Sequence, residues 1–463
     1  MYAQDGLPPQ QRRWAMLTIA IAVTMAVLDG AITNIALPTI ARDLHVEAAD
    51  AIWVVNAYQL AVTVSLLPLA ALGDIFGYRR IYGVGLAIFT LASLACAMSH
   101  SLPALSLARV VQGFGAAGLM SVNTALIRFI YPRAMLGRGV GLNALVVATA
   151  SALGPSVAAA ILSVASWPWL FAVNVPLGAL ALGLAAPLLP RSPRAPNAFD
   201  LPSAGLSALT FGLLITGIDN LGRLSPLVAV ELAGAALAGF ILVRRQLALD
   251  APLLAVDLFK RPVFSLSVAT SICSFTAQGL AFVALPFYLE DVLGRSQVET
   301  GLLMTPWPLA VAFVAPIAGR LADRYPAGIL GGLGLAALSV GLLLVASMPA
   351  HAGLHDMAWR MAICGVGFGF FQSPNNRAIL TSAPRERSGS ASGILATARL
   401  IGQTTGAATV AVIFGLTGVA AAAAANGATA AVLLGAGFAA AGAVASSLRL
   451  FGQSRQTLSE TGD

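Results

Sequence analysis

Charged residues are scarce in this chain. They make up 10% of its 463 residues, whereas hydrophobic residues make up 58% and the mean hydropathy is +0.85. A soluble domain carries about 25% charged residues, so this chain has too few to cover a soluble surface of its size. The scarcity excludes a soluble protein and indicates one that crosses the membrane many times. The 26 basic residues are spread thinly over many loops, which excludes a nucleic-acid partner.

Cysteine and histidine are also scarce. The three cysteines lie inside separate apolar runs and offer neither a disulfide framework nor metal-ligand spacing; they are Cys96, Cys273 and Cys364. The four histidines fall in predicted outer loops, where we expect solvated side chains; they are His45, His100, His351 and His355. No metal site and no cofactor are predicted.

Sequence motifs of ATPases and of several enzyme classes are missing as well. The sequence has no P-loop, nucleophile elbow, HExxH pair or Rossmann fingerprint. We therefore expect no enzyme activity and no transport driven by ATP hydrolysis. Any transport must draw its energy from an ion gradient or from the gradient of the substrate itself.

Fourteen apolar runs have the length of a membrane span. They lie near 14–38, 52–72, 81–99, 103–126, 139–162, 168–189, 202–220, 225–243, 262–289, 298–319, 327–348, 358–381, 388–416 and 427–447. The first run is too long for a signal-peptide core and predicts a retained helix. The pattern predicts an all-α polytopic membrane protein with fourteen transmembrane helices.

The distribution of basic residues predicts the orientation of these helices. If the N-terminus is cytoplasmic and the spans alternate, twenty basic residues lie in inner segments and only four in outer loops; the four are Arg42, Arg223, Arg295 and Arg360. Positive residues favour the cytoplasmic side. Both termini are therefore predicted to be cytoplasmic.

The sequence repeats at an offset near 249. Ala36-Leu37-Pro38 recurs as Ala284-Leu285-Pro286, and the loop at 70–80 recurs at 319–326. Spans one to six thus correspond to spans nine to fourteen. The repeat predicts an N-terminal six-helix bundle over 1–190, a linker with two extra helices over 191–261, and a C-terminal six-helix bundle over 262–463. Two such halves are typical of transporters whose substrate site lies between them near the membrane midplane.

Asp29 is the most informative single residue. At about 1.5 Å rise per residue it lies roughly 24 Å beyond Arg13, past the midplane of a core about 30 Å thick. An ionised Asp at that depth costs at least about 2.5 kcal/mol, so it needs a partner or a proton. Arg109 of the fourth span lies at a depth that differs by only about 3 Å. We predict a proton-coupling pair of Asp29 and Arg109; the alternative is a permanent structural ion pair. Asp29 corresponds to Gln278 in the second half, so proton coupling is expected in the first half alone.

Other polar and aromatic residues in the spans are candidates for the substrate cavity. Gln112 lies one turn from Arg109 on the same helix face. The candidate cavity set is Asn34, Tyr58, Gln112, Asn143, Gln278, Trp307, Phe371 and Asn375. For the aromatic members, packing or interface anchoring is the alternative. Arg399 is interpreted as structural, with a position lining the inner cavity as its alternative.

Two short charged turns and one proline site are further candidates. Gly77 suits a positive φ in a tight turn, and the turn recurs in the second half. The predicted gating loops contain Asp74, Gly77, Arg79, Arg80, Asp323 and Arg324. Gly154 and Pro155 lie within the fifth span, where proline permits bending and small residues permit close helix approach.

Taken in order, these segments resemble a known family. The stretches Asp29–Pro38, Asp74–Arg80, Arg109–Ala117, Gly154-Pro155 and Trp167–Pro176 resemble motifs of the major facilitator superfamily, and within it of the fourteen-span drug:proton antiporters. The chain departs from these motifs at Gly30-Ala31, and at Ala150, Ala158 and Ala159, where the antiporter motif has glycine.

The resemblance implies a major facilitator fold and a proton-coupled antiporter that exports lipophilic, often cationic, compounds by alternating access. It implies that Asp29 is the proton site, Arg109 its partner, and Gly154-Pro155 the antiporter motif. We expect a monomer in the bacterial inner membrane whose partners are protons, a small lipophilic substrate and the lipid bilayer. Whether a periplasmic adaptor takes part is open.

Two other functions stay open at this point. One is a proton-coupled uptake permease for a small metabolite, which matched polar cavity residues in both halves would favour. The other is a non-transporting membrane receptor or assembly factor, against which the lack of a sizeable soluble domain argues.

Overall fold

The computed structural model is all-helical over the residues that it describes, which are 6–132, 135–192, 199–222, 227–249, 256–349, 353–383, 388–417 and 421–460. The first half contains α1 (Pro9–Asp43), α2 (Ala48–Ala51), α3 (Trp53–Phe76), α4 (Tyr78–Ala97), α5 (Leu102–Ile130), α6 (Leu136–Leu162), α7 (Pro168–Ala172) and α8 (Asn174–Leu188). An inserted pair follows, α9 (Leu201–Gly222) and α10 (Val228–Leu247).

The second half begins with a 3-10 turn, η2 (Val256–Lys260), and with α11 (Pro262–Phe287), which continues into a π-helical turn, η3 (Tyr288–Val292). It goes on through α12 (Gln297–Met304), α13 (Pro306–Leu321), α14 (Ala327–Ala346), α15 (Leu354–Ser382), α16 (Ser388–Thr417) and α17 (Ala421–Glu460).

Each predicted apolar run coincides with helix, which confirms the predicted fold class. Two runs are broken into helical pieces, between α7 and α8 and between α12 and α13. The break at Thr305 directly precedes Pro306, and Pro176 follows the break at Val173 by three residues. Proline lacks a backbone N–H and favours the first turn of a helix, which explains both breaks. In the described chain, twelve helical segments are long and apolar enough to cross a membrane. α10 and α15 have the length but are not among them, and α10 carries three charged residues, Glu231, Arg244 and Arg245.

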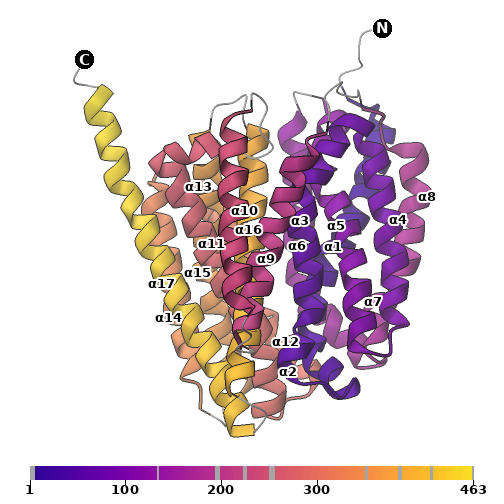
Figure 1. The fold of residues 1–463 in the computed structure, drawn as a ribbon, viewed down its shortest axis with the longest axis vertical. Coiled ribbons are helices and arrows are strands. Elements are labelled where there is room, and N and C mark those ends of the chain that lie inside the picture. Colours follow the sequence, from indigo (N-terminus) through magenta and orange to yellow (C-terminus); the bar gives the residue numbers. More distant parts are fainter. Residues whose placement is uncertain are drawn as a thin grey trace.

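The two halves pack their helices in the same pairs. In the first half α1 lies against α6 and α8, and α5 lies against α3 and α4; in the second half α11 lies against α16 and α17, and α15 lies against α13 and α14. Figure 1 shows these two groups side by side, with both termini at one end of the molecule. We call that end, around Pro9, the terminal face, and the end around Asp43 the opposite face. The limits at 190 and 261 stay a prediction.

Glycines bring corresponding helices close together in both halves. A Cβ on Gly115 of α5 would collide with the backbone of Phe89 in α4, and a Cβ on Gly367 of α15 would collide with the backbone of Leu338 in α14. Small residues allow membrane helices to approach this closely.

The inserted hairpin lies where the two halves meet. α9 packs on α10, and also on α3 of the first half and α16 of the second. It therefore covers one side of the seam between the halves.

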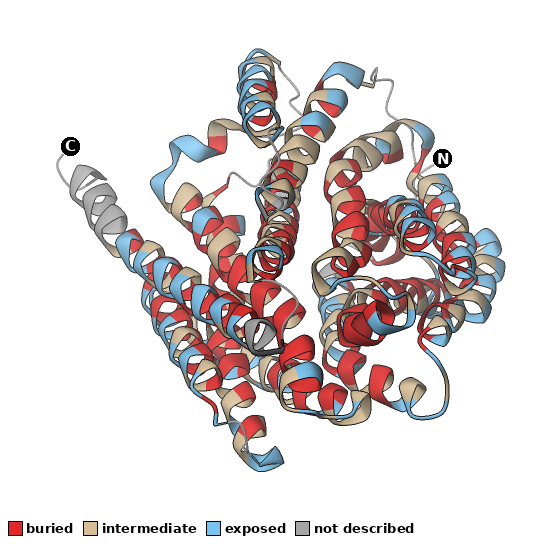
Figure 2. Cartoon of the chain, turned by 60° about the horizontal axis from the view of Figure 1, so that its bottom comes forward, coloured by how far each residue is buried: buried red, intermediate tan, exposed pale blue. Residues whose placement is uncertain are grey.

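Burial follows the pattern of a membrane protein. Figure 2 shows buried residues on the sides of the helices that face one another and exposed residues on the periphery. Large apolar side chains remain exposed on that periphery, among them Leu91 at 68%, Leu107 at 67% and Phe313 at 69%. An exposed apolar surface of this kind suits the lipid interior, which the sequence predicts as its environment.

Candidate functional site

The Asp29 carboxylate lies in a closed polar cluster inside the first half. Its side chain is 0% exposed and forms an ion pair with Arg109 of α5. Its other oxygen accepts hydrogen bonds from the amide of Gln112 at 2.8 Å and from the amide of Asn174 at 3.1 Å. One carboxylate oxygen thus faces a guanidinium and the other faces two amides, so the buried side chain is fully supplied with hydrogen-bond donors.

Arg109 is held as tightly as its partner. Its Nε donates to the carbonyl oxygen of Val54 at 2.9 Å, and its Nη1 donates to Oε1 of Gln112 at 2.6 Å. The guanidinium carbon lies 4.2 Å from the ring centroid of Tyr58 and 5.5 Å from that of Phe171. Aromatic faces attract a cation, so Tyr58 helps to hold Arg109 and does not line an open cavity.

Six helices, α1, α3, α4, α5, α7 and α8, supply this cluster. Gly113 allows α5 to approach the carbonyl of Tyr58 in α3, where a Cβ would lie 2.6 Å from that oxygen. The approach brings Arg109 against α3. From α4, Ser93 accepts from Nε2 of Gln112 at 2.9 Å and the thiol of Cys96 lies 3.6 Å from Oε1 of Gln112. Gln112 thus fixes both Asp29 and Arg109.

Four members of the cluster were not among the predicted site residues: Ser93, Cys96, Phe171 and Asn174. Phe171 and Asn174 fall within the Trp167–Pro176 stretch that resembles a family motif, which was the available signal. Ser93 has no such signal, because a serine in an apolar run most often bonds its own helix backbone, and Ser93 also does so.

A second polar group lies between the halves. Gln403 of α16 donates to Gln278 of α11 at 3.2 Å, and Thr404 of α16 donates to Gln59 of α3 at 3.3 Å. The second bond joins the two halves. Gln278 is half-buried, in contrast to the enclosed Asp29 to which it corresponds in the repeat.

Three predicted cavity residues lie in the packed core. Trp307 and Phe371 are fully buried, with edge-to-face contacts to Phe282 and Phe275 respectively. Asn375 is also buried and accepts from Arg449 at 2.8 Å. None of the three faces open space, so the structure supports the packing alternative for the aromatic pair.

The remaining predicted cavity residues are two asparagines. Asn34 is 7% exposed, and its side-chain oxygen has no hydrogen-bond partner among the described residues. Asn143 is half-buried and accepts from Asn123 at 3.0 Å.

The predicted gating loops are held within their own halves. Gly77 has φ +95° between α3 and α4, which confirms the prediction of positive φ. Tyr78 donates to Asp74, and Arg79 donates to the carbonyls of Ala186 and Leu189 at the end of α8.

In the corresponding loop of the second half, Asp323 pairs with Arg377 of α15. The side chains of Arg80 and Arg324 form no hydrogen bond or ion pair with another described residue, although their backbone N–H groups donate to the carbonyls of Gly77 and Leu321. No described side chain of these loops joins the two halves in this conformation.

The proline site of α6 contacts both α1 and the second half. A Cβ on Gly154 would lie 2.5 Å from the Cβ of Ala31, and a Cβ on Gly301 of α12 would lie 2.6 Å from the carbonyl oxygen of Pro155. Next to it, Ser156 and Thr305 share a hydrogen bond of 2.8 Å. Gly154 and Pro155 therefore lie where the halves meet.

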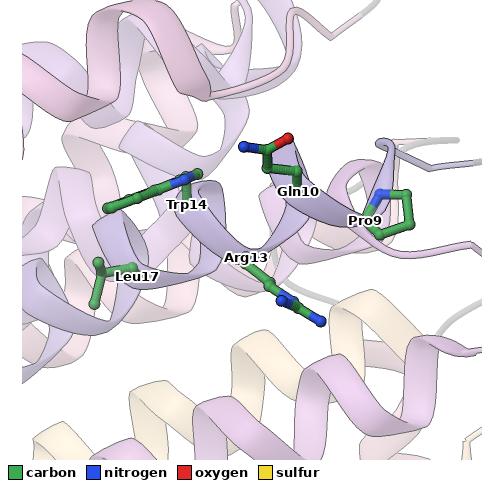
Figure 3. Close-up of a pocket in the computed structure, with 5 residues that line it drawn as sticks. All are labelled: Pro9, Gln10, Arg13, Trp14 and Leu17. Carbon is green, nitrogen blue, oxygen red and sulfur yellow. The ribbon is translucent and has the colours of Figure 1, made fainter.

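The halves are joined at the opposite face. Arg42 at the end of α1 contacts Glu290 at 2.5 Å and Asp291 at 3.1 Å, both in the π turn that ends α11. At the terminal face, the first turns of α1 border an open pocket of about 570 Å³. Figure 3 shows Arg13 extending away from the α1 axis on the side opposite to Gln10.

This fold and these buried sites define a membrane transporter built from two related halves. The Major Facilitator Superfamily model matches residues 19–407. The chain belongs to this superfamily.

Three curated relatives cover most of the chain. It is 60% identical over 413 residues to the uncharacterized transporter YebQ of Escherichia coli, covering 88% of this chain and 90% of the relative. It is 32% identical to the riboflavin transporter RibZ of Clostridioides difficile, covering 84% and 85%. It is also 32% identical to the multidrug resistance protein Stp of Mycobacterium tuberculosis, covering 84% and 74%.

A solved structure shares the fold. It is a bacterial homolog of the human lysosomal transporter Spinster in an inward-facing and unoccupied conformation, with a TM-score of 0.68 and 18% identity over 96% of this chain and 97% of that one.

Proposed function

We propose that this transporter is a proton-coupled antiporter that exports lipophilic compounds from the cytoplasm of a bacterium. The observation that carries the proposal is the enclosed pair of Asp29 and Arg109. A carboxylate kept at membrane depth is costly and marks a functional site by default. Among relatives, Stp is named a multidrug resistance protein.

In the proposed mechanism, Asp29 and Arg109 are paired in one conformation of the transporter and separated in the other. The terminal face is assigned to the cytoplasm because basic residues favour that side. With the halves joined at the opposite face by Arg42 and Glu290, this conformation corresponds to the one that receives substrate from the cytoplasm. Here Asp29 is paired with Arg109, so it has released its proton.

In the second conformation, Arg109 and Asp29 are separated. When the opposite face opens, movement of α5 against α1 separates Arg109 from Asp29, and the carboxylate takes a proton because it has lost its counter-ion. Closing brings Arg109 back and expels the proton toward the cytoplasm. A group that binds a proton in one state and releases it in the other links the gradient to the conformational change.

The substrate binds between the halves in this proposal. Gln59, Gln278, Gln403 and Thr404 are the polar side chains that meet there. We propose that the chain works as a monomer and without a cofactor.

The test is transport by the purified protein in proteoliposomes with an imposed pH gradient. The acidic dye 8-anilinonaphthalene-1-sulfonate and the neutral dye N-phenyl-1-naphthylamine serve as probes. We expect accumulation on the acidic side that collapses when a protonophore removes the gradient. Accumulation that persists without the gradient, or that runs with the protons, would overturn the proposal.

Movement with the protons would favour uptake, the second candidate. One observation favours it: the relative RibZ is named a riboflavin transporter. The direction of dye movement in the same vesicles separates the two functions.

A further inference from the structure

Arg399 is a charged residue at membrane depth that the proposed proton switch does not use. It lies eleven residues after the first residue of α16, or about 17 Å along the helix at 1.5 Å per residue. A guanidinium at such depth costs about 2.5 kcal/mol or more unless it is compensated. Its surroundings therefore need an explanation.

Among the described residues, the interaction found for its guanidinium is with one aromatic ring. The guanidinium carbon lies 5.6 Å from the ring centroid of Phe275 in α11. Among the described residues, no atom accepts a hydrogen bond from Arg399 and no carboxylate lies within 4 Å. None of its nitrogens is a fully enclosed polar atom without a hydrogen-bond partner. The guanidinium thus borders open space.

Two other arginines of the described chain, Arg109 and Arg449, are fully buried and differ from the half-buried Arg399. Arg109 is neutralised by Asp29. Arg449 is 1% exposed and donates to Ser267 at 2.9 Å, to Asn375 at 2.8 Å and to Ser446. Both have acceptors that replace water, whereas Arg399 has none among the residues that the structure describes.

The half-buried Arg399 lies on the part of α16 that faces the first half. On α16, Leu400 and Ala396 pack against the core of the first half. Gln403, one turn after Arg399 and on the same face, bonds Gln278. Arg399 therefore lies at the edge of the face of α16 that contacts both α3 and α11.

No described carboxylate balances this charge. Asp29 is enclosed by its own partners. Glu231, in the inserted hairpin, accepts two hydrogen bonds from Asn220 at 2.9 and 3.0 Å. The polar groups described near Arg399 between the halves are neutral amides and a hydroxyl.

We propose that Arg399 binds an acidic group on the transported compound, so that the substrate class is amphipathic organic anions. A carboxylate or sulfonate would replace the missing acceptors, because guanidinium binds such groups with two parallel hydrogen bonds. The Phe275 ring offers an apolar surface beside it, and Gln278 and Gln403 offer further hydrogen bonds. The inference rests on the proposed function, whose substrate it specifies.

The experiment compares two dyes that share a ring system. 8-Anilinonaphthalene-1-sulfonate carries an acidic group, and N-phenyl-1-naphthylamine does not. Their binding to purified protein in lipid nanodiscs is measured by fluorescence for wild type, Arg399→Gln and Arg399→Lys. We expect wild type to prefer the sulfonate, and Arg399→Gln to lose at least about tenfold in sulfonate affinity, equal to about 1.4 kcal/mol. Affinity for the neutral dye should stay within about twofold, and Arg399→Lys should keep most of the sulfonate affinity.

A matched arginine serves as control. Arg244 also lies over an aromatic ring, 5.3 Å from the centroid of Phe240, but on the inserted hairpin. Arg244→Gln should leave the binding of both dyes unchanged. The inference is overturned if wild type does not prefer the sulfonate, if Arg399→Gln retains its affinity, or if that variant loses both dyes equally.

The binding assay separates this inference from the proposed function. Sulfonate binding that depends on Arg399 supports the inference even if a pH gradient moves neither dye, in which case the proton antiport fails. Gradient-driven movement of the neutral dye together with sulfonate binding that ignores Arg399 supports antiport and rejects the inference.

Discussion

Asp29 and Arg109 lie 80 residues apart in the sequence and form an ion pair whose side chains are 0% and 1% exposed. Neither side chain is in contact with bulk water. Removing one member of a buried pair leaves an uncompensated charge, which costs more than the pair itself contributes. The proposed switch uses this asymmetry, because separating the two side chains leaves a buried carboxylate without its counter-ion.

The first prediction concerns the stability of this pair. Arg109→Gln should lower the free energy of unfolding by about 3–5 kcal/mol, since it leaves the carboxylate without its counter-ion. Combining it with Asp29→Asn should restore part of that loss, because both charges are then absent. Thermal unfolding of the purified proteins at neutral pH measures both effects. Equal stability of Arg109→Gln and wild type would contradict a coupled pair.

The second prediction concerns closure at the opposite face. Ser156 of α6 and Thr305, just before α13, are in hydrogen-bond contact across the halves. Cysteines at both positions should form a disulfide under mild oxidation and block transport, and a reductant should restore it. Each single cysteine variant is the control. Arg42→Ala should slow the cross-linking, because it removes the ion pairs to Glu290 and Asp291. Full transport by the cross-linked protein would show that this contact does not open.

The third prediction concerns close packing in the first half. Gly115→Ala places a methyl group against the backbone of Phe89 and should cost about 1–3 kcal/mol, as overpacking does. Gly83→Ala in α4 meets nothing within 4 Å and should be nearly neutral. Melting temperatures of the two variants provide the comparison. If both variants lose the same stability, close approach is not the cause.

The fourth prediction is a pH dependence at the start of the inserted hairpin. Asp200 accepts from the backbone N–H of Ser203 at 3.2 Å and from Arg245 at 2.9 Å. Burial raises its pKa, but these bonds outweigh burial and bring the pKa below its ordinary value. A depressed pKa in the folded state stabilises the protein above the unfolded pKa, and this stabilisation is lost as the pH falls through the folded pKa.

Asp200→Ala should therefore cost about 1 kcal/mol at pH 7, as the loss of a helix cap does, and the difference from wild type should vanish in acid. Thermal unfolding of Asp200→Ala and of wild type, at pH 7 and in acid, measures this difference in stability. Asp43→Ala, at an exposed position, is the control. A difference that grows on acidification would reverse the predicted sign.

Much of the fold could be predicted from hydrophobicity alone, because each apolar run has the length of a membrane span. The contact of Asp29 with Arg109 could also be predicted, since two charges at equal depth stabilise each other in a medium without water. The positive φ of Gly77 follows from the tight turn that it occupies.

The faces of the helices could not be predicted in the same way. Lipid and protein interior are both apolar, so the sequence does not mark which side of a helix is inward. For this reason Trp307 and Phe371 were expected at the cavity but lie in the core. Asn375 was expected there too, and it bonds Arg449, a partner 74 residues away. Asn174 and Ser93 were missed because only the tertiary arrangement brings them to the cluster.

The central claim is that Asp29 carries the coupled proton. The direct test compares Asp29→Asn with Glu231→Gln, a second carboxylate within the spans that lies outside the cluster. In proteoliposomes, N-phenyl-1-naphthylamine is followed under an imposed pH gradient and in exchange at equal pH. We predict that Asp29→Asn keeps exchange but loses gradient-driven accumulation, whereas Glu231→Gln keeps both. Accumulation by Asp29→Asn at the level of wild type would contradict the account.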